Sequence, residues 1–200
     1  MASPIQPLLN SINKKGVVLP NKYKIDVQWP QSIQLQPETN EWDNELMFRA
    51  TEVNLAGRNL ASFPEVNIYG PVREVVEGVT YAEEISVSFL DTRALEIRRY
   101  FETWQELCFN NLGDRPSWDL GYYNDYIGAL DIEILGQYPT GYHSVYGIRC
   151  FEVYPKSLGP IPLSSAPTTT PITTQVSFSF RYWKTINYNA GAEGFGSSVG

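Results

Sequence analysis

Few residues in this sequence are suited to chemistry, and their neighbours give them little support. His143 is the single histidine, so a catalytic triad would depend on it, yet it follows a turn at Pro139–Tyr142 and is most simply a surface residue. Cys108 and Cys150 lack the paired spacing of a zinc or redox motif. We expect both to be inert core thiols. The sequence permits a disulfide between them but does not show one.

Two carboxylate pairs have the chemistry of a general acid and base. Glu83 and Glu84 are adjacent, and Asp131 and Glu133 share one face of an expected strand because side chains alternate along a strand. Such pairs are usually just a solvated strand face. The sequence also has no glycine-rich phosphate loop, dinucleotide fingerprint or nucleophile elbow. We therefore predict that the protein is not an enzyme and holds neither cofactor nor metal.

Length and charge bound the class of protein. A chain of 200 residues can bury a core as one domain. It carries a net charge of −7, which disfavours a duplex reader because phosphate binding needs a clustered basic surface. No apolar stretch is long enough to span a membrane as a helix, and the first residues do not resemble a signal peptide. We expect a soluble, acidic, aromatic-rich domain.

Alternation of apolar and polar side chains predicts that most of the chain is extended. Expected strands, in chain order, are 17–29, 46–53, 66–69, 79–90, 128–137, 144–154 and 173–184. They are separated by a loop at 30–44, a turn at 57–59, an aromatic-rich loop at 115–125 and a polar connection at 155–171. The alternation is clearest around Ile85, Val87 and Phe89, whose strand also carries a small polar face, typical of a sheet that is wet on one side.

One long helix is expected, over about 93–110. Its apolar stripe is formed by Leu95, Tyr100, Phe101, Trp104, Leu107 and Cys108. Asp91 or Thr92 is expected to cap its first turn by accepting a free amide hydrogen bond. A shorter apolar cluster at 5–12 would form a turn or two of helix, or an arm.

Together these elements predict a mainly β (α+β) domain: an antiparallel β-sandwich or open barrel with one central helix. We expect residues 1–186 to form this single domain and the glycine-rich residues 187–200 to form a flexible tail. The exposed sheet edges are either completed by a neighbouring copy in a closed ring or blunted by proline and charge in an ordinary sandwich.

The order of segments resembles the tail tube protein of contractile-tailed bacteriophages (the myovirus tail tube family). The resemblance is carried by LPNKYKIDV, FRATEVNLAGRN, ISVSFLDTRALEIRRYFETWQELC, FEVYPKSLGPIPLSS and TTQVSFSFRYWKT, and by the aromatic pair Tyr182–Trp183. It covers most of residues 8–186 and extends more faintly to type VI secretion tube proteins. Three segments, 30–44, 115–125 and 187–200, look longer than a minimal tube subunit needs.

The resemblance implies a structural virion protein: a subunit of hexameric rings that stack into the hollow inner tube of a contractile tail, through which DNA is ejected. It implies self-association and contacts with sheath, baseplate or hub, and tail terminator proteins. Tape measure protein and DNA would pass through without specific binding, and the tail would assemble in the host cytoplasm. Small polar and acidic strand faces would line the lumen, with candidates Glu84, Ser86, Ser88, Asp131, Glu133, Ser177 and Ser179. The 54–62 loop and the N-terminal segment would make ring-to-ring contacts.

Two alternatives stay open on sequence grounds. A baseplate protein that initiates the tube would share the fold. A carbohydrate-binding β-sandwich would explain the aromatic residues Trp118, Tyr122 and Tyr123, because such rings stack on sugars. An exposed aromatic cluster would favour the sugar-binding module, and a cluster buried between subunits would favour the tube.

Overall fold

The computed structural model describes residues 19–34, 46–65, 69–81, 84–110, 117–138, 141–165 and 171–186. Their elements, in chain order, are β1 (Tyr23–Gln28), α2 (Gln31–Gln34), β2 (Ala50–Val53), β3 (Arg58–Pro64), β4 (Glu74–Tyr81), β5 (Glu84–Leu90), α4 (Glu96–Cys108), α5 (Tyr123–Tyr126), β6 (Gly128–Tyr138), β7 (Gly141–Leu158), β8 (Thr173–Ser179) and β9 (Tyr182–Ile186). The apolar cluster at 5–12 and the tail at 187–200 lie outside the described residues.

Seven of these strands form one antiparallel sheet in the order β1-β6-β7-β8-β5-β2, with β9 on the free side of β7. The sheet does not close into a barrel, because β1 and β2, at its two ends, are not paired with each other. The Tyr23 hydroxyl nevertheless bridges them by donating to the Ala50 carbonyl at 3.0 Å. The expectation of a mainly β, open antiparallel fold is confirmed.

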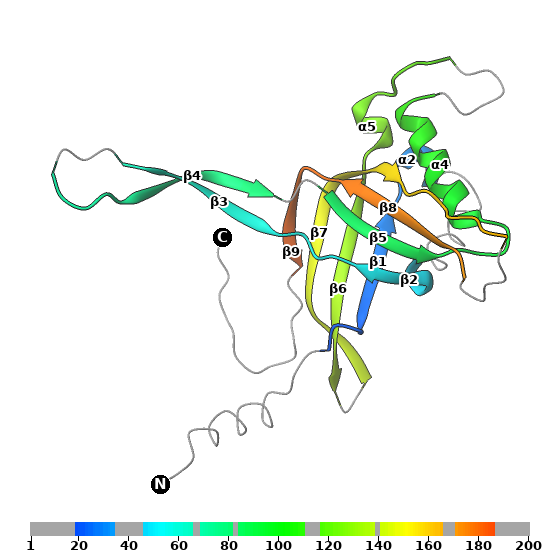
Figure 1. Cartoon of the computed structure of the whole chain (residues 1–200), viewed down its shortest axis with the longest axis horizontal. Coiled ribbons are helices and arrows are strands. Elements are labelled where there is room, and N and C mark those ends of the chain that lie inside the picture. Colours follow the sequence, from blue (N-terminus) through cyan, green and yellow to red (C-terminus); the bar gives the residue numbers. More distant parts are fainter. Residues whose placement is uncertain are drawn as a thin grey trace, which may run out of the picture.

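The sheet folds into two layers because β7 changes partners along its length. β7 pairs with β6 as far as Val153 and with β9 as far as Phe151, whereas from Tyr154 onward it pairs with β8. We call β1, β6, the first part of β7 and β9 the charged layer. We call the second part of β7, β8, β5 and β2 the serine layer. In Figure 1 the strands of the serine layer run across those of the charged layer.

The core lies between the two layers. Alternate residues of each strand point inward, and the buried set includes Ile25, Val27, Leu130, Ile132, Ile148, Cys150, Ile85, Val87, Phe89, Val176 and Phe178. These residues form a single apolar cluster. Burial of apolar surface is therefore what holds the layers together, while the outward residues are left for other roles.

Helix α4 closes one end of this core (Figure 1). It is shorter than the expected 93–110, because Leu95 adopts a left-handed φ of 55° and Phe109 is already extended. The predicted cap is confirmed: the Thr92 hydroxyl accepts from the Glu96 amide at 3.1 Å and the Asp91 carboxylate from the Ile97 amide at 3.3 Å.

The buried face of α4 is formed by Ile97, Phe101 and Trp104. Ile97 was not among the residues expected there, whereas Tyr100, Leu107 and Cys108 are only partly buried. Trp104 lies at the centre of this packing. Its ring centroid is 5.1 Å from that of Trp29, and its indole nitrogen donates to the Tyr126 carbonyl at 2.7 Å.

Strands β3 and β4 form a two-stranded arm that projects from the body (Figure 1). This arm corrects two expectations. Residues 57–59 are not a turn, because β3 begins at Arg58, and 79–90 is not one strand, because its first residues belong to β4. The arm grows out of the serine layer, since β3 follows β2 in the chain and β4 precedes β5, while β2 is hydrogen-bonded to β5 and β3 to β4.

Three further boundaries differ from the sequence expectation. Residues 46–49 are helical rather than extended. Strand β7 continues through Pro155 to Leu158, so the expected connection begins later. The expected strand 173–184 is broken at Phe180–Arg181 into β8, in the serine layer, and β9, in the charged layer.

Candidate assembly surfaces

The outer face of the serine layer is a continuous patch of small hydroxyl side chains. Ser86 lies opposite Ser177, and their hydroxyl oxygens are 3.2 Å apart. Ser88 lies opposite Gln175, and Ser157 of β7 extends the row beyond Ser177. These strands put most of their apolar side chains into the core, so alternation leaves mainly polar ones on this face.

The acidic residue of this face, Glu84, is paired. The Lys156 ammonium lies 2.5 Å from the Glu84 carboxylate. Glu84 itself lies opposite Ser179 across the ladder between β5 and β8. The ion pair balances the negative charge of Glu84, so the serine face is polar without being strongly acidic at this point.

The outer face of the charged layer is different in kind. Arg149 binds Asp131 through both carboxylate oxygens, with the Nε–Oδ1 distance at 2.7 Å, and Asp131 is buried. Glu133 accepts a hydrogen bond from the Ser144 hydroxyl. Asp26 lies directly opposite Asp131 in the β1–β6 ladder. Bidentate pairing with Arg149 keeps the buried Asp131 charge compensated.

The structure thus divides the sequence-predicted lumen residues into two groups. Glu84, Ser86, Ser88, Ser177 and Ser179 lie together on the serine layer, whereas Asp131 and Glu133 lie on the charged layer. The two groups point away from the common core on different layers. Sequence reasoning did not include Ser157 and Lys156, because the strand β7 was expected to end before them.

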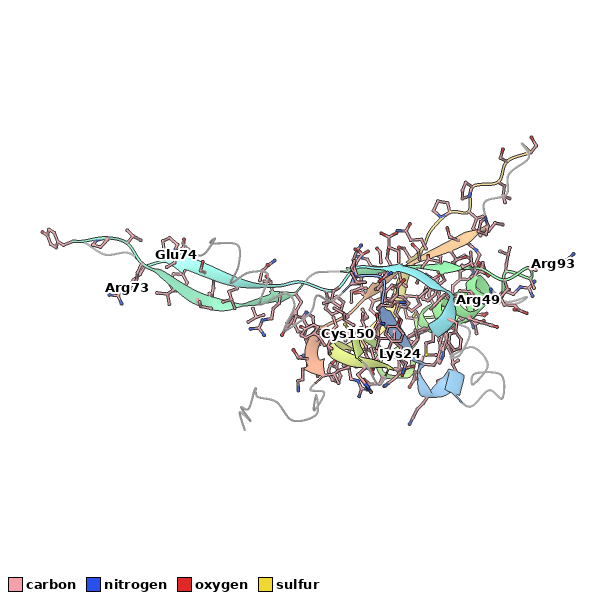
Figure 2. All side chains as sticks on the ribbon, turned by 90° about the horizontal axis from the view of Figure 1, so that it is seen from below. Lys24, Arg49, Arg73, Glu74, Arg93 and Cys150 are labelled. Carbon is pink, nitrogen blue, oxygen red and sulfur yellow. The ribbon has the colours of Figure 1, made fainter. Side chains whose placement is uncertain are left out.

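The arm exposes an unusual amount of apolar surface. Its two strands and tip carry the exposed side chains Leu60, Phe63, Tyr69, Val72, Val75, Val76 and Val79, with Tyr69 92% exposed. Leu60 lies opposite Val79, and Phe63 opposite Val75. Figure 2 shows Arg73 and Glu74 towards its far end, well away from the body. Exposed apolar residues gathered on a projecting two-stranded ribbon mark an interaction surface.

The root of the arm is held by the aromatic pair that closes the tail tube resemblance. Trp183 packs edge-on against Tyr81, with ring centroids 6.1 Å apart, and its indole nitrogen donates to the Gly57 carbonyl at 3.3 Å. Tyr182 stacks on Phe151 with centroids 4.9 Å apart. The pair therefore links β9 to the arm on one side and to β7 on the other.

The aromatic loop residues are exposed in the single chain. Trp118 is 65% exposed and Tyr122 83% exposed. Trp118 packs edge-on against Phe109, while the Tyr123 hydroxyl donates to Glu152 at 2.8 Å. Each of these two rings is thus engaged with its own neighbour. The exposure of Trp118 and Tyr122 in the single chain is the outcome that the sugar-binding alternative leads one to expect.

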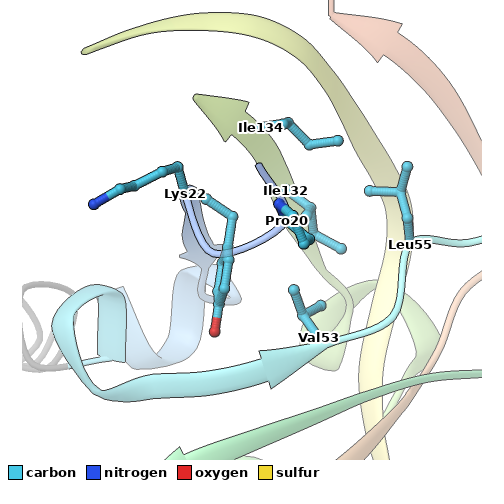
Figure 3. Close-up of a pocket in the computed structure, with 7 residues that line it drawn as sticks. Pro20, Lys22, Val53, Leu55, Ile132 and Ile134 are labelled. Carbon is cyan, nitrogen blue, oxygen red and sulfur yellow. The ribbon is translucent and has the colours of Figure 1, made fainter. Parts of the chain in front are cut away.

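An apolar pocket opens where the two ends of the sheet approach each other (Figure 3). It is lined by Pro20, Lys22, Tyr23, Val53, Leu55, Ile132 and Ile134. Strand β6 presents Ile132 and Ile134 to this pocket and Asp131 and Glu133 to the opposite side. The carboxylates suggested as an acid and base therefore do not line it.

The remaining candidates for chemistry have the surroundings of structural residues. Cys108 and Cys150 are free thiols; burial raises the pKa of Cys108 to about 11 and that of Cys150 to about 12, so neither is a thiolate at neutral pH. His143 lies on the exposed end of β7. In the described ranges, no three His, Cys, Asp or Glu side chains gather as a metal site would require. No described helix is long and apolar enough to cross a membrane.

Comparison with known proteins assigns this architecture to a class. The family model described as "Phage tail tube protein" matches residues 18–186, so the chain belongs to the phage tail tube protein family. This is a family of structural proteins, and the prediction that the protein is not an enzyme is confirmed. No curated protein sequence matches the chain.

Solved structures of contractile injection systems share the fold at low sequence identity. A chain of the anti-feeding prophage baseplate aligns with a TM-score of 0.57 at 9% identity, covering 85% of this chain and 95% of its own. A chain of the PVC sheath-tube complex in the extended state aligns with a TM-score of 0.56 at 8% identity, covering 94% of this chain and 100% of its own. A chain from the tube-terminating cap of the anti-feeding prophage aligns with a TM-score of 0.56 at 9% identity, covering 86% of this chain and 92% of its own. At 8–9% identity, these similarities show that the chains share one fold.

Proposed function

We propose that this chain is the repeating subunit of the inner tube of a contractile phage tail, with six copies in each ring and rings stacked into a conduit for DNA ejection. The observation that carries the proposal is the arm, which exposes apolar side chains on both of its strands. Such a surface calls for a protein partner, and a second copy of the chain supplies one in a self-assembling tube. The arm includes residues 58–62 of the 54–62 segment, which was expected to make ring-to-ring contacts. The N-terminal segment, expected to make such contacts as well, is not part of the arm.

The serine layer is the proposed wall of the lumen. Its outer face consists of small polar side chains from neighbouring strands, including Glu84, Ser86, Ser88, Ser177 and Ser179. Hydroxyl groups without exposed apolar surface offer little to which passing DNA or tape measure protein would adhere. Asp131 and Glu133, on the charged layer, are assigned outside the lumen.

The proposed partners are the sheath around the tube, the baseplate or hub below it and the terminator above it. Solved structures similar in fold come from a sheath-tube complex, a baseplate and a terminating cap. Residues 1–186 would act as one unit in the tube, and assembly would take place in the host cytoplasm before the tail joins the virion. A tube-initiating ring at the baseplate is the second candidate, because a chain from a baseplate aligns with a TM-score of 0.57, similar to the 0.56 of the chain from a sheath-tube complex.

The test is negative-stain electron microscopy of the purified protein at high concentration. We expect six-membered rings or hollow tubes. The variant Leu60→Asp places a charge on the apolar face of the arm and should abolish stacking, whereas Asn59→Asp adds the same charge at an exposed polar position beside it and should not. Single rings alone from the unaltered protein would favour the tube initiator. Small monomeric particles from the unaltered protein would contradict self-assembly.

A further inference from the structure

The two strands that pass between the layers do so at the same place. Strand β7 changes layer between Phe151 and Tyr154, and the chain from β8 to β9 changes layer at Phe180–Arg181. The Arg181 amide donates to the Phe151 carbonyl at 3.1 Å, which joins the two crossings by backbone. We call this region the corner.

Glu152 occupies a conformation at the corner that its side chain does not favour. In the ladder between β6 and β7, Gly128 lies opposite Val153 and Ala129 opposite Phe151, so Glu152 is the extra residue of a β-bulge. Its φ is 57°, in the left-handed region. Glycine is the usual residue at a bulge position of this kind, and any residue with a Cβ is strained there.

The Glu152 side chain makes contacts that a glycine cannot provide. One carboxylate oxygen accepts from Arg181, at 2.9 Å, and the other from the Tyr123 hydroxyl, at 2.8 Å. Arg181 lies at the other crossing, and Tyr123 lies in α5. The carboxylate thus ties both crossing strands to the helical end of the molecule.

The aromatic rings on either side reinforce the same connection. Tyr123 packs edge-on against Tyr126, with centroids 5.5 Å apart, and Tyr126 packs against Tyr154 at 5.6 Å, just beyond the bulge on β7. Tyr182 stacks on Phe151 just before it. Contacts therefore flank Glu152 along both strands.

We propose that Glu152 is a positioning residue that fixes the angle between the charged layer and the serine layer. A strained residue persists where its surroundings determine it, and here those surroundings are the two crossings and α5. Within the proposed function, this angle sets the wedge that each subunit fills in a ring. That second step rests on the proposed function, while the first concerns the single chain.

The test measures a distance that changes with the angle between the two layers. Spin labels at Lys24→Cys and Gln175→Cys report a distance between the layers, and labels at Glu52→Cys and Gln175→Cys report one within the serine layer. Both pairs are made with Cys108→Ser and diluted with unlabelled protein, so that only distances within a chain contribute. We expect Glu152→Gly and Glu152→Gln to lose the single narrow interlayer peak and to keep the intralayer peak.

A second readout separates positioning from simple stability. Glycine accepts a φ of 57° freely, so Glu152→Gly should melt no lower than the unaltered protein even as the interlayer distance spreads. A narrow interlayer peak in Glu152→Gly would overturn the proposal. If the unaltered protein forms no rings, the proposed function fails and the distance measurement still decides the role of Glu152. If rings form, Glu152→Gly should yield rings of mixed diameter.

Discussion

The ammonium of Lys156 lies 2.5 Å from the carboxylate of Glu84, on the face that we propose as the wall of the lumen. A strand that was expected to end at Tyr154 continues far enough to bring this lysine into place. The acidic character of the whole chain therefore does not carry over to this part of the serine face. Polar hydroxyl groups, rather than negative charge, dominate it.

Replacing Glu84 with lysine tests the assignment of the lumen. Glu84→Lys sets two lysines side by side on the serine face, so tubes should still assemble but DNA should pass more slowly, and added salt should relieve the delay. Glu133→Lys is the matched control on the charged layer and should leave passage unchanged. Ejection rates of assembled particles provide the measurement. Equal slowing by both variants would contradict the assignment of the serine layer to the lumen.

Trp104 should be the most sensitive single position of the core. Trp104→Ala removes a fully buried ring, which costs about 3–5 kcal/mol, enough to prevent soluble folding of a marginally stable domain. Trp104→Phe keeps a ring but leaves the Tyr126 carbonyl without its donor, a loss of about 1–3 kcal/mol. Urea unfolding of the soluble fraction compares the free energies of unfolding of the unaltered protein and the two variants. A soluble Trp104→Ala protein with an unshifted midpoint would show that this packing does not stabilise the fold.

Gly128 should not tolerate even a methyl group. A Cβ at this position would lie 2.2 Å from the Gln28 carbonyl oxygen and 2.9 Å from Cζ2 of Trp104. Backbone and a packed indole cannot both move aside, so Gly128→Ala should lower the free energy of unfolding by about 1–3 kcal/mol. Gly57→Ala is the control, because nothing lies within 4 Å of its Cβ. Thermal melts of the two variants should differ clearly, and equal melts would refute the clash.

The hydroxyl of Tyr123 should lose its proton at a higher pH than that of an ordinary tyrosine. Burial, together with the hydrogen bond to Glu152, raises the pKa of Tyr123 to about 12 from 10.0. The folded chain then holds its proton more tightly than the unfolded chain, so the stability from this group is complete below pH 10.0 and falls as the pH rises towards 12. Tyrosinate absorbance, compared between the unaltered protein and Tyr123→Phe, isolates the group. Glu152→Gln should bring the pKa of Tyr123 down, and an unchanged pKa would exclude the carboxylate as a cause.

The sequence pattern predicted the parts of the fold whose periodicity reflects burial. Ile85, Val87 and Phe89 alternate with serines because one side of β5 faces the core, and the same is true of Val176 and Phe178 in β8. The stripe around Phe101 and Trp104 likewise revealed α4. In each case local side-chain spacing and tertiary burial agree.

The arm escaped prediction because its apolar residues are not buried in the chain. Leu60 and Val79 pair with each other across an exposed ribbon, so no core imposes alternation on β3 and β4. The break between β8 and β9 at Arg181 was not predicted either, because the alternation of apolar residues continues through it. Phe178, Phe180 and Tyr182 keep the spacing of one strand across it, while the change of layer occurs where the Arg181 amide donates to the Phe151 carbonyl, next to the bulge at Glu152.

The division of the lumen candidates also lay beyond sequence reasoning. Glu84 and Glu133 are alike as acidic residues on the polar faces of strands, and only the pairing order shows that their strands belong to different layers. The positions of Ser157 and Lys156 depend on β7 continuing past Pro155. A proline without an amide hydrogen usually signals the end of central pairing, and here the strand exchanges its partner at that point instead.

The pairing order has a consequence for the timing of synthesis. Ile85 lies opposite Phe178, and Tyr23 opposite Ile134, so β1 and β5 are synthesised well before the strands with which they pair. Contacts between residues so distant in the chain form slowly. A ribosome-bound chain that has not yet emerged as far as β8 and β9 has no complete serine layer, and Trp183 is not yet available to hold the root of the arm. The serine layer and the root of the arm can therefore be completed only after β8 and β9 have been synthesised.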